Sequence, residues 1–256
     1  MTQAPSNSEA FSLIALGRTD STNAEARRRA ETGAAHGTLL WATEQTAGRG
    51  RRGREWVSKP GNFYASLILR PACEARQATQ LAFVTALAVG ALLEARFGVG
   101  PRYKWPNDVL VDGCKIAGIL AESMMGKDQG VEWMVLGVGI NVASHPEGVE
   151  YPATSLHGLG SKRVKIAELA EAFGEAFFRC YDSWEKEGFA PVREAWLRRA
   201  AGIGEPIRVR LEQETIEGKF EDLDAEGALL LLKEGSADPV RITTGDVFPM
   251  SVIGDS

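Results

Sequence analysis

Four arginines stand among glycines in one short segment of the chain, Gly48-Arg49-Gly50-Arg51-Arg52-Gly53-Arg54, which we call the arginine loop. Glycines let a backbone approach a ligand closely, and guanidinium groups bind carboxylates and phosphates through planar, permanently charged forks. The segment therefore predicts a loop that becomes ordered around a small anion. A solvated basic loop, or a patch that binds nucleic acid, is an alternative that this segment alone leaves open.

The same segment fits the pattern G-x-G-x-x-G of dinucleotide-binding sites, but its surroundings do not. In such sites the glycine turn leads from a strand into a helix, whose N-terminus receives the pyrophosphate. Here residues 55–61 include Pro60 and Gly61 and do not resemble the start of a helix, and the next element is predicted as a strand. We therefore reject a nicotinamide-binding site.

A second polar group, Lys104-Trp105-Pro106-Asn107-Asp108, follows a predicted strand. A turn at Asp112-Gly113 makes the next segment an antiparallel neighbour, so we expect Asp108 and Lys115 near the ends of adjacent strands. Lys115 begins an otherwise apolar strand, where an amine is costly to bury unless it meets an anion. Asp108 could hold a divalent metal, since carboxylates suit Mg²⁺. A surface hairpin with a Lys–Asp ion pair is the alternative.

Both helices and strands are needed to position these residues. Helices are predicted over 24–30, 77–97, 165–186 and 189–200, and strands over 38–44, 62–70, 102–105, 109–111, 114–123 and 133–142. The segment 77–97 is apolar on more than one face, which predicts a central helix. Glycines at 137 and 139 inside a strand often mark close approach by a ligand. From 207 onward, short strands and glycine turns predict a small β-barrel-like unit. The order predicts an α+β fold with a mixed, mostly antiparallel sheet flanked by helices.

The composition is that of a globular chain with a mildly acidic charge. Of its 256 residues, 44% are apolar and 25% are charged, and the net charge is −5. This argues against a protein whose whole surface coats nucleic acid or anionic lipid. The three cysteines form no C-x-x-C pair, which predicts reduced thiols. The N-terminus lacks a signal-peptide pattern, and the apolar segment 81–93 is shorter than the ~20 residues of a membrane span, so we expect a soluble, cytoplasmic protein.

Taken in order, six motifs resemble those of biotin protein ligases, also called biotin–[acetyl-CoA-carboxylase] ligases. The motifs are Asp20-Ser21-Thr22-Asn23, Gln45 with the arginine loop and Glu55-Trp56, Lys104 to Asp108, Lys115-Ile116-Ala117-Gly118-Ile119-Leu120, Gly137-Val138-Gly139-Ile140-Asn141, and Ala153-Thr154-Ser155-Leu156. The resemblance spans about 19–156. It implies a class II synthetase-like catalytic domain at 11–202, after a flexible tail at 1–10, and a C-terminal SH3-like β-barrel at 203–256.

The resemblance also implies the reaction and the residues that perform it. Biotin and ATP, with Mg²⁺, would give biotinyl-5′-AMP and pyrophosphate, and biotin would then pass to a lysine of a biotin carboxyl carrier domain of a carboxylase. Catalytic roles fall on Arg51, Lys115 and Asp108, with Asp108 as the metal ligand. The implied biotin-binding residues are Ser21, Thr22, Asn23, Gln45, Gly48, Arg49, Gly50, Arg51, Lys115 and Gly118. The implied ATP-binding residues are Arg49, Arg51, Arg54, Trp56, Asn107, Lys115 and Asn141.

Three alternatives remain beside this one. They are a lipoate or octanoate ligase or transferase of the same fold superfamily, a non-catalytic biotin-binding protein, and a nucleic-acid-binding regulator. Only 20 residues precede Ser21, too few for a three-helix DNA-binding module, so we expect the monofunctional type, with no DNA or membrane partner. The resemblance leaves a homodimer open. Glu55 replaces a basic or small polar residue common in the family, and we expect a modest effect.

Overall fold

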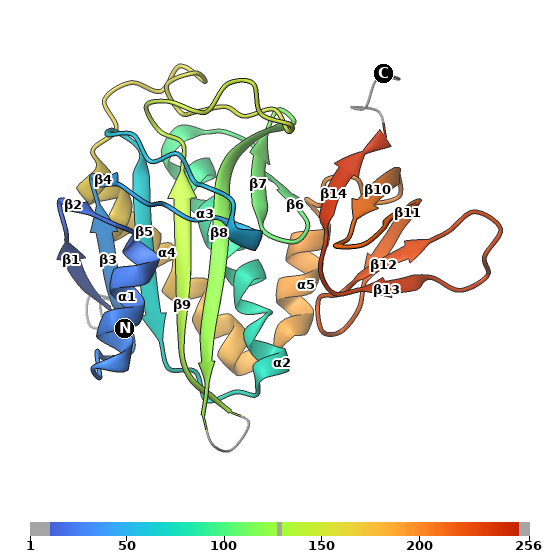
Figure 1. Ribbon diagram of the computed structural model, residues 1–256, viewed down its shortest axis with the longest axis horizontal. Helices are drawn as coiled ribbons and strands as arrows, with labels where there is room; N and C mark the ends of the chain where they lie inside the picture. The colour runs from blue at the N-terminus through green and yellow to red at the C-terminus, as the bar shows by residue number, and fades with distance from the viewer. Residues whose placement is uncertain (1–10, 127–129, 251–256) are drawn as a thin grey trace, which may run out of the picture.

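A seven-stranded sheet carries most of the fold in the computed structural model, which describes residues 11–126 and 130–250 (Figure 1). Its strands are β1 (Ser12–Ala15), β3 (Thr38–Ala42), β5 (Phe63–Leu69), β6 (Arg102–Lys104), β7 (Asp108–Val111), β8 (Cys114–Met125) and β9 (Val131–Ile140), in the order β1-β3-β5-β9-β8-β7-β6. β1 pairs with β3 in parallel, and the other neighbours are antiparallel. The predicted mixed, mostly antiparallel α+β sheet is therefore confirmed. The tail predicted at 1–10 lies outside the described residues.

Helices cover the two faces of this sheet unequally. α1 (Thr22–Glu31) packs on one face over β5 and β9, where Ala26 and Ala30 meet Ile68 and Val135. On the other face lie α2 (Ala75–Ala78), α3 (Leu81–Phe97), α4 (Ile166–Glu187) and α5 (Phe189–Leu197), which join the main core (Figure 1). α1 does not cover β8 on this face of the sheet. The arginine loop crosses the sheet there (Figure 1).

The predicted central helix over 77–97 is divided in two. α2 ends at Ala78, α3 begins at Leu81, and the buried Gln80 between them accepts a hydrogen bond from Trp184 Nε1 at 2.9 Å. The segment Ala75–Phe97 is long and apolar enough to cross a membrane by composition alone. In this fold two thirds of its apolar window is buried, because α3 packs between the sheet and α4, and the segment is a core helix.

A second, five-stranded antiparallel sheet follows α5. Its strands are β10 (Pro206–Arg210), β11 (Thr215–Leu223), β12 (Leu229–Leu232), β13 (Val240–Ile242) and β14 (Asp246–Pro249), in the order β13-β12-β11-β10-β14. Within the described residues β13 and β14 do not pair, so the predicted small β unit is present as an open sheet. The domain boundary predicted at 202/203 falls in the connection between α5 and β10 and stays a prediction.

Buried and partly buried polar contacts fix the second sheet against the first unit. Trp105 Nε1 donates to Gly227 O at 3.0 Å, and Arg193 Nε of α5 donates to Leu223 O at 2.7 Å. Phe83 of α3 packs edge-on against Phe189, and Gly227 lies against the Phe83 ring. These contacts place β14 beside the arginine loop.

The packing around Gly90 in α3 gives a test of this core. A Cβ atom at Gly90 would lie 3.0 Å from two ring carbons of Tyr103 and closer still to its hydroxyl, and that ring is 2% exposed and stacks on Trp196. We expect Gly90→Ala to lower the free energy of unfolding by about 1–3 kcal/mol, because overpacking outweighs the gain in helix propensity. Urea unfolding measures it. Ala91→Ser on the exposed side of α3 is the control and should change stability by about 0.5 kcal/mol or less. A Gly90→Ala protein as stable as wild type would contradict this packing.

Candidate active site

A pocket of about 340 Å³ opens on the sheet face beside α1. That volume suits a small organic ligand. Every residue predicted for the site lines it except Gly48, so the wall includes Ser21, Thr22, Asn23, Gln45, Arg49, Gly50, Arg51, Arg54, Trp56, Asn107, Asp108, Lys115, Gly118 and Asn141. A Cβ atom at Gly48 would lie 2.9 Å from Gln45 Nε2 and closer to Trp56 O, so this glycine serves the packing of the loop.

The start of α1 places a polar array at one end of the pocket. Ser21 is the N-cap, and its Oγ accepts from Ala24 N at 3.5 Å, so the helix begins at Thr22, two residues earlier than predicted. Thr22 donates to Gln45 Oε1 through its backbone N at 2.7 Å and its Oγ1 at 3.0 Å. Gln45 stands on β4 (Glu44–Gln45), which pairs in parallel with β2 (Arg18–Thr19).

Asn23 is held from two sides in the same array. Its Oδ1 accepts from Ser66 Oγ at 2.6 Å, and its Nδ2 donates to Glu122 Oε2 at 2.7 Å. A side chain at Gly137 would collide with the Asn23 amide, so this glycine makes room for a side chain of the same chain. The array presents fixed donors and acceptors to a polar ligand group.

Asp108 lies between two ammonium groups at the other end of the pocket. Lys115 Nζ is 2.6 Å from its Oδ1 and Lys104 Nζ is 2.9 Å from its Oδ2. Asp108 is 7% exposed. Burial opposes its ionisation, but the two lysines together outweigh burial and lower the pKa of Asp108 to about 2. The alternative of a surface hairpin is therefore wrong, although the expected Lys–Asp pair is present.

The β7–β8 hairpin produces this contact. It turns at Asp112 and Gly113, which have left-handed φ values of 50° and 76°. The pairing register shifts between Val109 and Leu110, so Ile116 is an extra residue on β8. A bulge re-aims its neighbouring side chains, and here Lys115 is directed at Asp108 across the hairpin.

The same geometry does not fit the expectation that Asp108 binds Mg²⁺. Both of its oxygens already face lysine ammonium groups, and a divalent cation would have to displace at least one of them. In 11–126 and 130–250, no group of three or more His, Cys, Asp and Glu residues is arranged to hold a metal ion. Asp108 is therefore placed as the partner of two lysines and does not fit a magnesium ligand.

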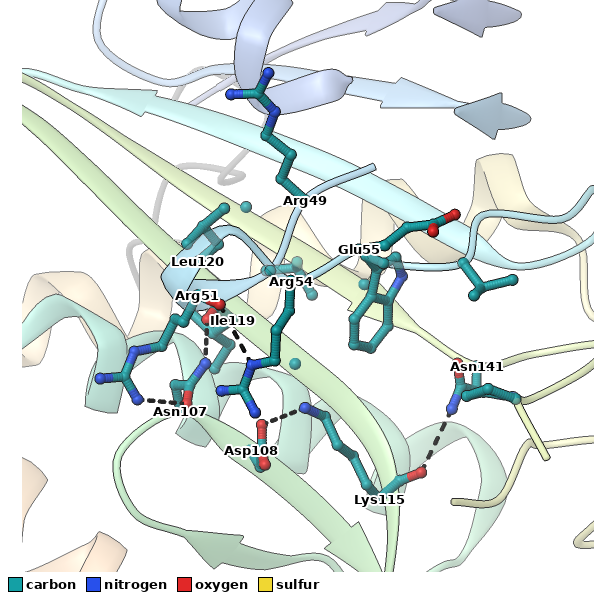
Figure 2. A pocket seen from close by; sticks show the side chains of 18 of the residues that line it. Arg49, Arg51, Arg54, Glu55, Asn107, Asp108, Lys115, Ile119, Leu120 and Asn141 are labelled. Carbon is teal, nitrogen blue, oxygen red and sulfur yellow. Dashed lines mark hydrogen bonds and ion pairs between the residues drawn. The ribbon is translucent and has the colours of Figure 1, made fainter. Parts of the chain in front are cut away.

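The arginine loop makes one sharp turn over the pocket. Arg51–Gly53 form a 3₁₀ turn in which Arg52 has φ 55° and Gly53 has φ 72°. Figure 2 shows Arg51 and Arg54 pointing toward Asn107 and Asp108, whereas Arg49 points away from them. Arg51 Nη1 donates to Asn107 Oδ1 at 3.3 Å. Burial lowers the pKa of Arg51 from its usual value, yet a guanidinium stays charged at neutral pH.

Trp56 lies flat on two strand glycines. A Cβ atom at Gly118 or Gly139 would come 2.9 or 2.5 Å from the indole ring, so any larger residue would displace it. Lys115 Nζ is 5.3 Å from the ring centroid. Trp56 Nε1 is buried and has no hydrogen-bond partner among the described residues. The close approach predicted from the strand glycines is made by this indole and by Asn23.

Asn141 holds two backbone segments of the site through hydrogen bonds. Its Nδ2 donates to Thr154 O at 3.0 Å, and Figure 2 shows its bond to Lys115 O, which is 3.4 Å long. Lys115 N donates to Pro152 O at 2.7 Å. Asn141 therefore fixes the backbone that carries Lys115.

Several lining residues were not predicted. Asp246 and Phe248 come from β14, and Glu150 and Tyr151 come from the connection after β9. No motif in these short segments marks them as functional. Asp246 and Phe248 reach the pocket only through the docking of the second sheet, and Glu150 and Tyr151 reach it from the connection after β9. Lys104 was part of a recognised motif but received no role.

Comparison with known proteins agrees with this geometry. Residues 16–141 match the biotin/lipoate A/B protein ligase family, and residues 202–249 match the biotin protein ligase C terminal domain. The chain is 45% identical to the biotin–[acetyl-CoA-carboxylase] ligase of Paracoccus denitrificans, over 91% of this chain and 98% of that protein. It is 38% identical to the bifunctional ligase/repressor BirA of Bacillus spizizenii, over 82% of this chain and 66% of that protein. The structure of the biotin protein ligase from Aquifex aeolicus in complex with biotin and ATP matches with a TM-score of 0.79 and 30% identity, covering 92% of this chain and 97% of that one.

The lowered pKa of Asp108 predicts a specific pH dependence of stability. Since the pKa is about 2 in the fold and about 3.8 without it, the ion pairs stabilise the protein fully above pH 4, and this contribution is lost as the pH falls toward 2. The difference in unfolding free energy between wild type and Asp108→Asn should therefore shrink between pH 4 and pH 3, as urea titrations would measure. The exposed Asp238→Asn is the control. A difference that stays constant over this range would show that the two lysines do not lower the pKa of Asp108.

Proposed function

This chain belongs to the biotin protein ligase family, and we propose that its pocket joins biotin to ATP, forming biotinyl-5′-AMP and pyrophosphate, and then transfers biotin to a lysine of a biotin carrier domain. The observation that carries the proposal is the arrangement of the pocket. A hydrogen-bonding array for a polar ring stands at one end, and Lys115 with the arginine loop stands at the other.

The polar array favours biotin over lipoate. The ureido ring of biotin carries two N–H donors and one carbonyl acceptor, and Thr22, Asn23 and Gln45 present side-chain groups that can meet them. The dithiolane ring of lipoate offers neither, so it would form no hydrogen bonds with these groups. A site built to hydrogen-bond its substrate rejects an analogue that lacks the partner groups strongly.

The first step brings two anions together. A biotin carboxylate oxygen attacks the α-phosphorus of ATP, a new C–O–P link forms, and the bond to the leaving pyrophosphate breaks. Lys115 and Arg51 lie on the pocket wall where they can neutralise the carboxylate and the charge that develops on the phosphate. Because Asp108 holds the Lys115 ammonium in place, little reorganisation is needed when the charge develops. Binding both substrates in one pocket contributes the remaining acceleration through positioning.

Magnesium belongs to this proposal only as a companion of the nucleotide. Asp108 does not fit a magnesium ligand, so we assign it to Lys104 and Lys115. The other predicted contacts to ATP are supported by where the residues lie. Arg49, Arg51 and Arg54 lie on the loop over the pocket, and Trp56 Nε1 is a buried donor without a partner among the described residues.

The second step is acyl transfer. The deprotonated amine of the acceptor lysine attacks the carbonyl of the mixed anhydride, the bond to phosphate breaks, and AMP leaves with its negative charge. The anhydride hydrolyses in water, so a loop that covers it protects it until the acceptor arrives. The acceptor is then a lysine on a biotin carboxyl carrier domain. We propose a cytoplasmic location, which the free thiols of Cys73, Cys114 and Cys180 support.

One experiment tests the central proposal. Purified protein is mixed with ATP, Mg²⁺ and either biotin, lipoate or octanoate, and pyrophosphate release is followed with and without a carrier domain. With ATP and Mg²⁺ but no carrier domain, biotin should give pyrophosphate. When the carrier domain is added, one of its lysines should become biotinylated. No pyrophosphate with biotin would overturn the function, and a preference for lipoate would move the chain to the sister activity.

Loss of the Lys115 ammonium should slow adenylate formation. We expect Lys115→Ala to lower the rate of pyrophosphate release by ~10²-fold or more, as removal of an electrostatic donor does elsewhere. The exposed Lys219→Ala is the control and should keep the wild-type rate. Near-normal pyrophosphate release from the Lys115 variant would remove this residue from the mechanism.

Loss of the Arg51 guanidinium should release the intermediate. We expect Arg51→Gly to let biotinyl-AMP escape and label lysines of unrelated proteins, because the loop loses charge that holds the adenylate. The measurement is biotin transfer to bovine serum albumin, with Arg208→Ala on the second sheet as a control. Strict acceptor choice by the Arg51 variant would show that the charge does not retain the intermediate.

A further inference from the structure

A carboxylate of the second sheet stands among three guanidinium groups at the rim of the pocket. Asp246 Oδ1 accepts from Arg54 Nη2 at 2.8 Å, and its Oδ2 is 3.5 Å from Arg52 Nη1 and 3.7 Å from Arg210 Nη2. The Asp246 side chain is 11% exposed, whereas the arginines are a third to a half exposed. A carboxylate opposes the binding of phosphates nearby, so its presence here needs a reason.

The adjoining residues hold the third arginine of the same loop. Arg51 Nη2 donates to Thr244 Oγ1 at 3.2 Å, and its Nη1 donates to Gly245 O at 3.3 Å. Arg52 has a left-handed φ of 55°, which is costly for a residue with a side chain and persists only where contacts fix it. The turn before β14 therefore receives three arginines of the arginine loop.

Arg210 extends this cluster to another wall of the pocket. Its Nη1 and Nη2 pair with Glu150 Oε1 and Oε2 at 2.6 and 2.8 Å, and its guanidinium lies 4.8 Å from the centroid of the Phe248 ring. Glu150 belongs to the connection after β9. One ionic cluster thus joins the arginine loop, this connection and the second sheet, which are distant in the sequence.

Like charges make a closed arginine loop unstable unless an anion is near. Arg51, Arg52 and Arg54 lie within four positions, and they repel one another when the loop folds over the pocket. A guanidinium has five N–H donors, and Arg52 uses only Nη1 and Arg54 only Nη2 and Nε in the contacts described. Both therefore keep donors for a second anion while they contact Asp246.

We propose that Asp246 is a positioning residue that supplies the counter-charge for the arginine loop and holds it over the pocket before the nucleotide arrives. The phosphates then bind to a loop that is already ordered, so less binding free energy is spent on ordering it. The identity of the ligand in this proposal rests on the proposed function, in which the loop retains a phosphate-bearing intermediate. The rest of the proposal concerns the empty protein and can be tested without activity.

The first test measures opening of the loop in the ligand-free protein. Trypsin cleaves after Arg49, Arg51, Arg52 and Arg54 only when the loop opens, so the cleavage rate reports local opening. Asp246→Asn keeps the shape of the side chain and removes its charge. We expect this variant to speed cleavage in the loop by about tenfold. Cleavage after Arg96 in α3 is the internal reference and should not change. An unchanged rate in the loop, or equal acceleration at both sites, would overturn the proposal.

Two further variants separate charge from general stability. Glu217→Gln removes the Arg208–Glu217 ion pair, at 2.7 Å, on the same sheet, and should leave loop cleavage unchanged. Asp246→Glu keeps the charge and should cleave within about twofold of wild type. If Glu217→Gln opened the loop as much as Asp246→Asn, the effect would belong to the sheet as a whole and the assignment would be wrong.

The second test uses the complete reaction. Asp246→Asn should raise KM for ATP by about tenfold and speed release of biotinyl-AMP, while Glu217→Gln leaves both within twofold of wild type. A general defect of the second sheet would change both variants alike, and that result would contradict the proposal. If wild-type protein formed no adenylate, the proposed function would fail, and the cleavage rates would still decide the role of Asp246.

Discussion

The constraint on which this structure depends is the gathering of positive charge in a partly closed space. A site that holds a carboxylate and a phosphate together needs several cations, and these cations repel one another while the site is empty. At two places in the pocket, one buried carboxylate reduces the repulsion between neighbouring cations. Asp108 separates Lys104 from Lys115, and Asp246 faces Arg52 and Arg54. Each carboxylate has more cations around it than it can neutralise, so positive charge remains for the ligand.

The elements around the pocket are placed to make these contacts. The β7–β8 hairpin, with its bulge at Ile116, directs Lys115 at Asp108, and the Ser21 cap turns the first residues of α1 toward the sheet. Glycines at 118 and 139 let the Trp56 indole lie on the strands. Behind the sheet, α3 and α4 bury the main core, so the face that carries chemistry is backed by a rigid layer. The second sheet completes the rim from the remaining side.

Most of the site could be predicted because six motifs, spread over about 19–156, resemble those of biotin protein ligases. One contact follows from local sequence. The turn at Asp112-Gly113 allows only a short hairpin, which brings Asp108 and Lys115 together. The break between α2 and α3 was missed, and the buried Gln80 at this break accepts a hydrogen bond from Trp184, which is distant in the sequence. The metal role of Asp108 was expected from its residue type, and the two lysine contacts that oppose it are visible only in three dimensions. Gly137 and Gly139 were expected to mark close approach by a ligand, and they make room for Asn23 and Trp56 of the same chain.

By itself the sequence determined the α+β class and most of the helices and strands, because periodicity and turn residues are local properties. Its ordered motifs indicated the family and, through that resemblance, nearly all of the pocket wall. The tertiary structure alone decided how charge is balanced in the pocket. Asp246, Glu150 and Arg210 carry no motif. Asp246 and Arg210 reach the arginine loop only because the second sheet packs against α5 and the Trp105 loop, and Glu150 pairs with Arg210 from the connection after β9. Ion pairs between distant segments depend on where the packed core places each backbone, and no short pattern of residues encodes that distance.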